Sequence, residues 1–243
     1  MNNIHFNIES WLALSPSLES KEQWRLWALA DQEWPKTTSS SPVNEIPAVF
    51  RRRMSLLSKL AIQTALSLVK NNDIDFIVFS SRHGELHRTV KLLTDILHGE
   101  DASPMAFSQS VHNTAAGLLT IVSKKAIPAT SLAAGEHSLH SALIEASAYL
   151  AENPEHRVLV VDFDQPLPEQ YEEFDEMKYQ AFALGMVLTS GEQCHLSWQA
   201  ALQANVERSE ASLPQTLNVI AKLACDETSW QVAGQRYSWF WQC

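Results

Sequence analysis

Cysteine, positive charge and long apolar runs are all scarce in this chain of 243 residues. Its three cysteines are odd in number and scattered, which predicts reduced thiols and a cytoplasmic location. The net charge of −10 argues against nucleic acid as a partner and slightly against strong docking of an acidic protein on this chain alone. No run of 18 apolar residues is present, so no membrane-spanning helix is expected. The first residues, MNNIHFNIES, lack the basic stretch of a secretory signal.

Strand and helix patterns alternate along the chain, which suits one α/β domain or a large half of a two-domain enzyme. The predicted strands before and after the central region are Ile4–Trp11, Asp75–Ser80, Arg157–Phe163 and Ala181–Ser190. The predicted helices are Lys21–Ala30, with Ser20 and Gln23 as a capping box, Phe50–Lys70 and Glu85–Leu97. Trp24 and Trp27 share one apolar helix face and are expected in the core.

The stretch from residue 103 to 146 organises the rest of the chain. A short extended run is expected to end at Val111-His112-Asn113, and an apolar helix follows over residues 113–123. Beyond Pro128, a strand-like segment over residues 129–133 leads into Gly135-Glu136, and a second apolar helix starts near His137. Strand, sharp glycine turn and helix start form a nucleophile elbow, in which the turn residue stands exposed above a helix N-terminus.

This stretch resembles the N-terminal half of the β-ketoacyl synthases of the thiolase-like superfamily. The residues that fit without a gap are Ser103-Pro104, Asn113, Ala116-Gly117, Thr120-Ile121, Pro128, Ser131 and Ala133. In that family the elbow residue is a cysteine that carries the acyl chain, and the same register places Glu136 there, after Gly135. The pair is similar to the Gly-Gln of chain-length factors, the inactive partners of ketosynthases. A carboxylate cannot replace the thiolate, because condensation needs a soft nucleophile that is also a good leaving group.

A second departure from the family lies after about residue 195, where the resemblance ends. Family enzymes continue with a second half that brings two histidines and a lysine, whereas here only residues 196–243 remain and His195 has no matching motif. The resemblance therefore implies one domain over residues 1–243: half of a thiolase-like fold, with a mixed five-stranded sheet, helices on its faces and a short C-terminal extension. Its terminal aromatic strand, residues 229–241, is expected to cover part of the exposed helix layer.

The resemblance implies a non-catalytic chain-length factor of an aryl polyene type II polyketide system. Such a subunit pairs with a full-length ketosynthase, needs no cofactor of its own, and meets acyl carrier protein and its phosphopantetheine arm only through the partner. The predicted interface comprises the helix over residues 113–123 and the strand with Ala129, Ser131 and Ala133. The residues expected to face the partner or its acyl tunnel are Met105, Ala106, Phe107, His112 and Asn113. Packing at the interface alone is the simpler reading of the first three.

Two other functions stay open at this stage: a malonyl-carrier-protein decarboxylase that uses Glu136, and a scaffold homodimer without a tunnel role. His112 has no cysteine or serine placed beside it with a third orienting group, so a structural role is favoured. His137 and His140 lie three apart on one helix without a third ligand, and no metal site is expected. The Arg51-Arg52-Arg53 triplet fits either a solvated face or a contact with an acidic partner.

Overall fold

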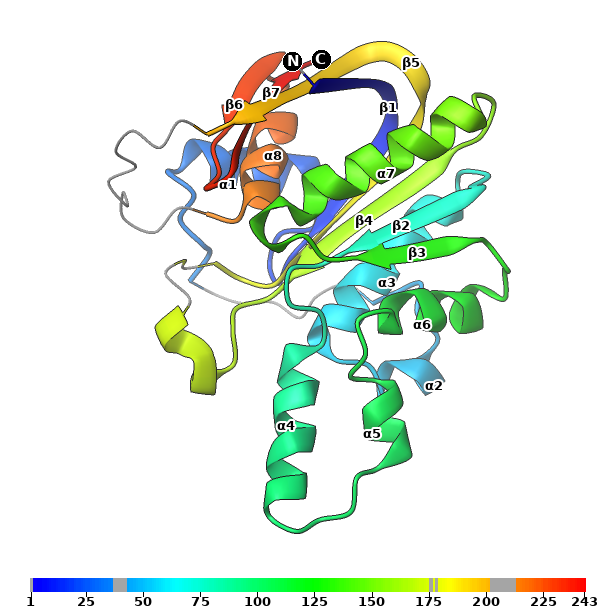
Figure 1. The fold of residues 1–243 in the computed structure, drawn as a ribbon, viewed down its shortest axis with the longest axis vertical. Coiled ribbons are helices and arrows are strands. Elements are labelled where there is room, and N and C mark those ends of the chain that lie inside the picture. Colours follow the sequence, from blue (N-terminus) through cyan, green and yellow to red (C-terminus); the bar gives the residue numbers. More distant parts are fainter. Residues whose placement is uncertain (1, 37–42, 175–176, 178, 202–212) are drawn as a thin grey trace.

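The computed structural model describes residues 2–36, 43–174, 177, 179–201 and 213–243 (Figure 1). Its strands are β1 (Asn2–Leu14), β2 (Phe76–Ser80), β3 (Ala129–Leu132), β4 (Val158–Asp164), β5 (Phe182–Ala200), β6 (Ser229–Val232) and β7 (Tyr237–Gln242). Its α-helices are α1 (Lys21–Leu29), α2 (Ala48–Arg51), α3 (Leu56–Val69), α4 (Leu86–Leu97), α5 (Pro104–Ser108), α6 (Thr114–Ser123), α7 (Ser138–Glu152) and α8 (Gln215–Ala224). Two 3₁₀ turns cover Gly135–His137 and Glu169–Phe174.

One mixed sheet organises the domain, in the strand order β3-β2-β4-β5-β7-β6 with β1 paired to β5. The first three strands are parallel and the remaining pairs are antiparallel. Helices α1, α7 and α8 cover one face, and α3 and α6 cover the other (Figure 1). The predicted α/β architecture is confirmed. The described residues form seven strands where five were expected, because the C-terminal residues join the sheet as a hairpin.

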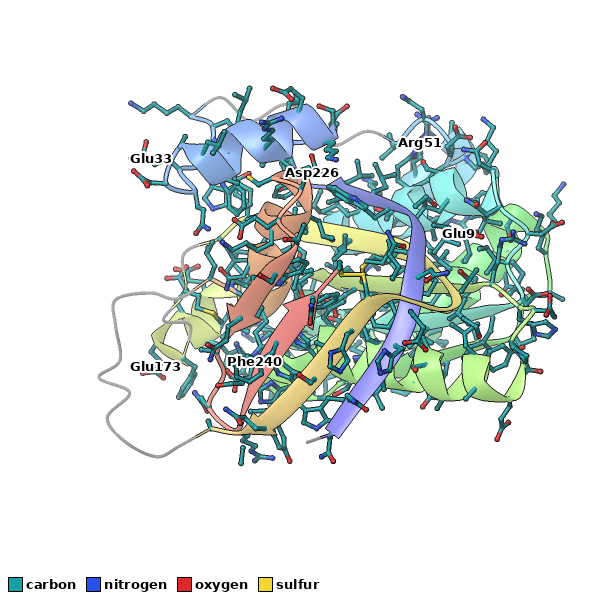
Figure 2. All side chains as sticks on the ribbon, turned by 90° about the horizontal axis from the view of Figure 1, so that it is seen from above. Glu9, Glu33, Arg51, Glu173, Asp226 and Phe240 are labelled. Carbon is teal, nitrogen blue, oxygen red and sulfur yellow. A yellow bond between two sulfur atoms is a disulfide. The ribbon has the colours of Figure 1, made fainter. Side chains whose placement is uncertain are left out.

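Strand β5 bends and serves two parts of the sheet. Its first half pairs with β4 and its second half with β7, so the sheet curls over α7 and α8 (Figure 1). Seen from above, Phe240 lies on β7, and β6 and β7 lie beside β5 (Figure 2). The predicted extension over residues 196–243, of which 202–212 lie outside the described residues, begins inside β5. Its aromatic strand is a hairpin of two strands that turns at Gly234.

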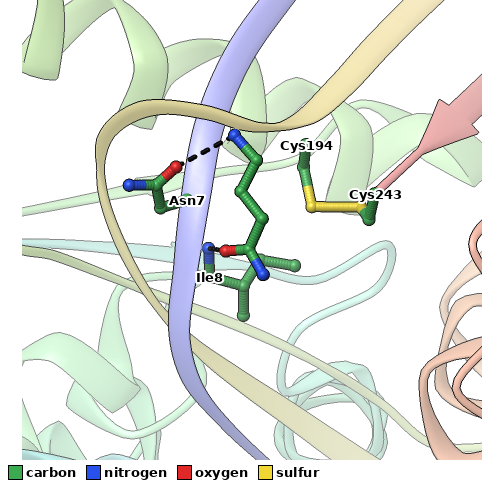
Figure 3. Close-up of a disulfide and its surroundings, with 5 residues drawn as sticks. Asn7, Ile8, Cys194 and Cys243 are labelled. Atoms are coloured by element: carbon green, nitrogen blue, oxygen red, sulfur yellow. Dashed lines mark hydrogen bonds between the residues drawn. A yellow bond between two sulfur atoms is a disulfide. The ribbon is translucent and has the colours of Figure 1, made fainter.

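The bend of β5 is set by Asn7 of β1. The β1–β5 pairing jumps from Phe6↔Cys194 to Asn7↔Thr189, so β5 bulges between these pairs. The Asn7 side chain fills the bulge: it accepts a 3.0 Å hydrogen bond from the Gln193 N–H (Figure 3). It also donates to Ser190 O at 3.3 Å. A Cβ atom on Gly191 would lie 2.1 Å from Asn7 Oδ1. Glycine at this position therefore makes room for the side chain that holds the bend.

A disulfide joins Cys194 of β5 to Cys243, just beyond β7, with Cα atoms 4.1 Å apart (Figure 3). The prediction of reduced thiols is therefore wrong for these two residues, whereas Cys225 is free. Antiparallel pairing of His195 with Gln242 places the two cysteines opposite each other, a proximity that a sequence separation of 49 does not reveal. Among the described helices, none is long and apolar enough to cross a membrane.

Side-chain caps mark the starts of three described helices, α1, α3 and α5. Ser20 and Gln23 form the predicted capping box, and Trp24 and Trp27 are buried as expected. The single long helix predicted over Phe50–Lys70 is wrong, because the chain breaks after α2 and Ser55 caps α3 by accepting the Ser58 N–H.

The extended run predicted before Asn113 is also wrong, since Ser103 caps the short helix α5 with Pro104 in its first turn.

Candidate functional site

The predicted strand–turn–helix elbow is present between β3 and α7. Gly135 takes a left-handed φ of +60°, which suits a residue without a Cβ atom. Ser138 fastens the turn: its Oγ accepts the Ala134 N–H at 3.1 Å and donates to Gly135 O at 2.8 Å. Glu136 stands at the turn beside the N-terminus of α7, with 29% of its side chain exposed. The residue exposed at the elbow is thus an acid, which we call the elbow carboxylate.

The elbow carboxylate is held by two neighbours. Its Oε1 accepts the backbone N–H of Gln235, in the turn between β6 and β7, and lies 3.1 Å from His137 Nε2. Burial raises the pKa of Glu136, but these two hydrogen bonds and the charge of Arg82 outweigh it, and the net pKa lies below the ordinary value. The group is therefore ionised at neutral pH and is not poised as a general acid.

Two buried histidines, His137 and His140, lie at the start of α7, and their hydrogen-bond partners determine which ring nitrogen carries the proton. Trp239 Nε1–H donates to His137 Nδ1 at 3.1 Å, and Trp241 Nε1–H donates to His140 Nε2 at 3.2 Å. An indole N–H can only donate, so both acceptor nitrogens are unprotonated. His137 therefore has its proton on Nε2, toward the elbow carboxylate, and His140 has its proton on Nδ1, 2.9 Å from Gln215 Oε1. Burial lowers the pKa of His140 to about 3, which keeps it neutral.

Both histidines use ring nitrogens for hydrogen bonds to other side chains, so we assign them no metal-binding role. Within the described ranges, no group of three or more His, Cys, Asp or Glu side chains is placed to hold a metal ion. No local sequence pattern predicts these contacts, because the tryptophans lie about a hundred positions further along the chain. In β7 the alternate residues Trp239 and Trp241 are buried, as on a strand that covers a helix.

Asp162 is a buried carboxylate near the elbow that sequence reasoning missed. It lies near the carboxyl end of β4 and accepts hydrogen bonds from Ser80 Oγ at 2.5 Å and from Thr216 Oγ1 at 2.6 Å. These bonds join β2, β4 and the first turn of α8. Burial raises the pKa of Asp162 to about 6, against an ordinary value of 3.8. The available signal was its position, since polar residues at the carboxyl ends of buried parallel strands often line sites.

Asp164, the last residue of β4, shapes the turn that follows β2. It accepts the Arg82 N–H at 2.7 Å, the Ser81 hydroxyl at 3.1 Å and the His83 N–H at 3.4 Å. Burial, followed by the nearby charge of Asp162, raises the pKa of Asp164 to about 7. Asp162 thus holds the start of α8 in place, and Asp164 holds the turn that follows β2.

A cavity of about 260 Å³ lies between these groups, and we call it the elbow cavity. Its polar wall includes the elbow carboxylate and both aspartates, and its apolar wall includes Leu139 and Phe182. The start of α8 and residues 231–233 of β6 and the following turn close it. No cysteine is among the described residues that line it, so the cavity brings together acids and amides without a soft nucleophile.

Three of the residues predicted to face the partner or its tunnel, Met105, Ala106 and Phe107, lie away from the elbow, on an arm formed by α4 and α5 (Figure 1). Met105 and Phe107 are 54% and 62% exposed, and Ala106 between them is half-buried. Arg88 of α4 donates hydrogen bonds to Gln109 and to Arg53 O, which fixes α5 against α4. The structure therefore does not bring these residues to the elbow of the same chain.

The other predicted interface residues lie at the edge of the sheet. Strand β3 is hydrogen-bonded to β2 on one side, and in the described part of the chain no strand pairs with its other side. Ala129 and Ala133 are exposed, and Ser131 Oγ has no hydrogen-bond partner among the described residues. His112 Nε2 lies 3.1 Å from Ser81 O, which agrees with the structural role favoured from the sequence, and Asn113 precedes α6 without a side-chain capping bond.

Comparisons with known proteins place this geometry in a family. The model of the β-ketoacyl synthase N-terminal domain matches residues 24–242. One chain of a solved complex, a ketosynthase (ApeO) with its chain length factor (ApeC) from Xenorhabdus doucetiae, is 31% identical with a TM-score of 0.88; the match covers 99% of this chain and 100% of that one. The ishigamide ketosynthase/chain length factor is 12% identical, with a TM-score of 0.72 and coverage of 99% and 98%.

A β-ketoacyl synthase from Burkholderia phymatum is also 12% identical, with a TM-score of 0.58, and the match covers 93% of this chain and 71% of that one. A search of curated protein sequences found no significant match. The two structures of low identity support the fold alone. The family model and the 31% identity over nearly the whole chain go further: the chain belongs to the β-ketoacyl synthase family and has the fold of a thiolase-like ketosynthase half.

Proposed function

We propose that this chain is a non-catalytic chain-length factor that pairs with a full ketosynthase and shapes its acyl tunnel in aryl polyene biosynthesis. The observation that carries the proposal is the elbow carboxylate: Glu136 stands where the family has its cysteine, and it is ionised and bound to its own chain. The likeness to a ketosynthase–chain length factor complex over the whole of the matched chain supports the same assignment.

The acceptor nitrogens of the two histidines near the elbow are also not free to act as bases. A general base needs an open lone pair within reach of the substrate proton. The Nδ1 lone pair of His137 is taken by Trp239, and that of His140 Nε2 is taken by Trp241. The decarboxylase alternative needs a group that polarises a thioester carbonyl, and His137 Nε2 lies 3.1 Å from the elbow carboxylate instead.

The free edge of β3 supports pairing with a partner. An unpaired strand edge in a sheet is a template for pairing with another chain. Helix α6 lies beside this edge and leaves Ile121 57% exposed. An obligate interface of the size typical of stable heterodimers, about 2,000 Å² or more, would cover both. Under this proposal β3 and α6 form the centre of the interface.

The arm gives the proposed subunit its means of acting on the partner. Leu93 and Leu97 of α4, together with Met105 and Phe107 of α5, are exposed, and α5 has no buried residue. A monomer seldom leaves such a patch in water, and burying one side chain of this kind is worth about 2 kcal/mol. We place this surface against the ketosynthase, with α5 at the far end of its acyl tunnel and the small Ala106 leaving room for a longer chain.

Co-expression with a cognate ketosynthase tests the proposal. A stable 1:1 complex is expected in size-exclusion chromatography with light scattering, and products should shorten when Ala106→Phe fills the tunnel end. Ala151→Phe, at an exposed position near the end of α7, is the matched control and should leave both results unchanged. Separate elution of the two chains would refute the pairing. A normal complex with unchanged product length in Ala106→Phe would instead support the scaffold function.

A further inference from the structure

The elbow carboxylate makes its main-chain contact with the turn between β6 and β7, residues 233–236, which we call the strap turn. Glu136 Oε1 accepts the Gln235 N–H, and a Cβ atom on Gly234 would lie 2.5 Å from His137 Cε1. The strap turn therefore packs directly onto the start of α7. We propose that Glu136 is a latch that holds the strap turn closed over the elbow cavity.

The latch needs an acceptor because a main-chain donor points at one oxygen of Glu136. The Gln235 N–H donates to Oε1, and His137 Nε2 lies 3.1 Å from the same oxygen. A carboxylate accepts the Gln235 N–H, and its charge is favoured by the N-terminus of the 15-residue helix α7. A glutamine oxygen at the same place would also accept this bond without the charge, whereas alanine would leave the Gln235 N–H unpaired.

The strap turn is anchored firmly through β7 and weakly through β6. Strand β7 is paired with β5 along its length, and the disulfide of Cys243 ties its end to β5. Among the described strands, β6 is the last of the sheet and pairs with β7 alone. The strap turn thus depends on the bond between Ala201 N and Arg236 O, the contacts at Gln215 and the latch.

The latch controls the elbow cavity because β6 and the strap turn form one of its walls. Val232 is 2% exposed and lines the cavity, two residues before the packed Gly234. Opening the strap turn would expose this wall to solvent. Residue 136 thus has a positive role, keeping the cavity shut, that explains why a side chain with an acceptor oxygen stands there. The role concerns one chain and is tested without the proposed partner.

Alkylation of a reporter thiol in the full chain tests the latch. With Cys225→Ser removing the free thiol, Val232→Cys should react slowly with iodoacetamide when Glu136 is present, and about tenfold faster in Glu136→Ala, as expected for the loss of about one hydrogen bond. Glu136→Gln should stay within about threefold of the wild-type residue. Val160→Cys, equally buried but in β4, is the control for loosening of the whole fold.

Each outcome decides for or against the latch. An unchanged rate at Val232→Cys in the Glu136→Ala background overturns it. An equal acceleration at Val160→Cys also overturns it, because the effect would then be global. Hydrogen exchange of backbone amides gives a second measurement that needs no reporter cysteine. The Gln235 N–H should exchange about tenfold faster in Glu136→Ala than in the wild type. Heterodimer formation plays no part in either readout, so failure of the latch and failure of the proposed function are separate results.

Discussion

Asp162 is expected to destabilise the folded protein at neutral pH, and replacing it with asparagine should reverse this. Burial raises the pKa of its carboxyl to about 6 from 3.8, so the folded state holds this proton more tightly than the unfolded state does. The corresponding stability is complete below pH 3.8 and is lost as the pH rises through about 6. A shift of about 2 units corresponds to about 3 kcal/mol.

Asparagine suits the site because both partners of Asp162 are hydroxyls. Ser80 and Thr216 donate to the carboxylate, and a hydroxyl can turn to accept from an amide nitrogen instead. We allow about 1 kcal/mol for the altered hydrogen bonds, which leaves Asp162→Asn about 2 kcal/mol more stable than the wild type at pH 7.5. Loss of the charge also removes one cause of the raised pKa of Asp164. Near pH 4 the variant should be equal or slightly less stable.

Urea unfolding followed by tryptophan fluorescence at pH 4, 5, 6 and 7.5 measures this difference. The two stability curves should cross between pH 4 and 7.5. Asp101→Asn, at an exposed position, is the control and should follow the wild-type curve within about 0.5 kcal/mol. Parallel curves for Asp162→Asn and the wild type, or a variant less stable at pH 7.5, would refute the reasoning.

Three further predictions concern the curled part of the sheet. Cys243→Ser should lower the free energy of unfolding by about 2–4 kcal/mol and make the urea midpoint insensitive to reductant, whereas the wild type should respond to it. Trp241→Phe keeps one aromatic ring but removes part of the buried indole and the N–H that reaches a buried histidine, and should cost at least about 1–2 kcal/mol in the same assay; no loss would argue against the assigned tautomer. Gly191→Ala should destabilise by about 2 kcal/mol through its clash with Asn7, and Asn7→Ala in the same chain should recover part of this; additive losses would contradict the packing described for the bend.

The parts of the fold that the sequence predicted depend on neighbouring residues. The elbow is one: Gly135 supplies the left-handed turn, and Ser138 closes it within three positions. The capping box of α1 is another, since Ser20 and Gln23 lie three residues apart. The long helix predicted over Phe50–Lys70 failed because Ser55 also binds the buried Glu85, a contact between residues thirty positions apart that favours a break there.

The candidate site was predictable only in its centre. The register of the family resemblance predicted that Glu136 lies at the elbow, but its hydrogen-bond partner Gln235 lies 99 positions away in the sequence. The tryptophans that fix the two histidines and the hydroxyl of Thr216 that reaches Asp162 are similarly remote. Contacts of this kind arise from the curling of β5, and a periodic pattern of apolar residues carries no information about which strand a bend will bring close.

The pairing of β1 with β5 constrains how the chain reaches its native state during synthesis. Strand β1 pairs Asn2 opposite Trp198 and Leu14 opposite Ala183, so its partner β5 is synthesised well over a hundred residues later. Until then β1 is an unpaired strand of alternating apolar and polar residues, a condition that favours misassociation and slow folding. Production of this protein should therefore respond to translation speed and to chaperones that shield nascent strands.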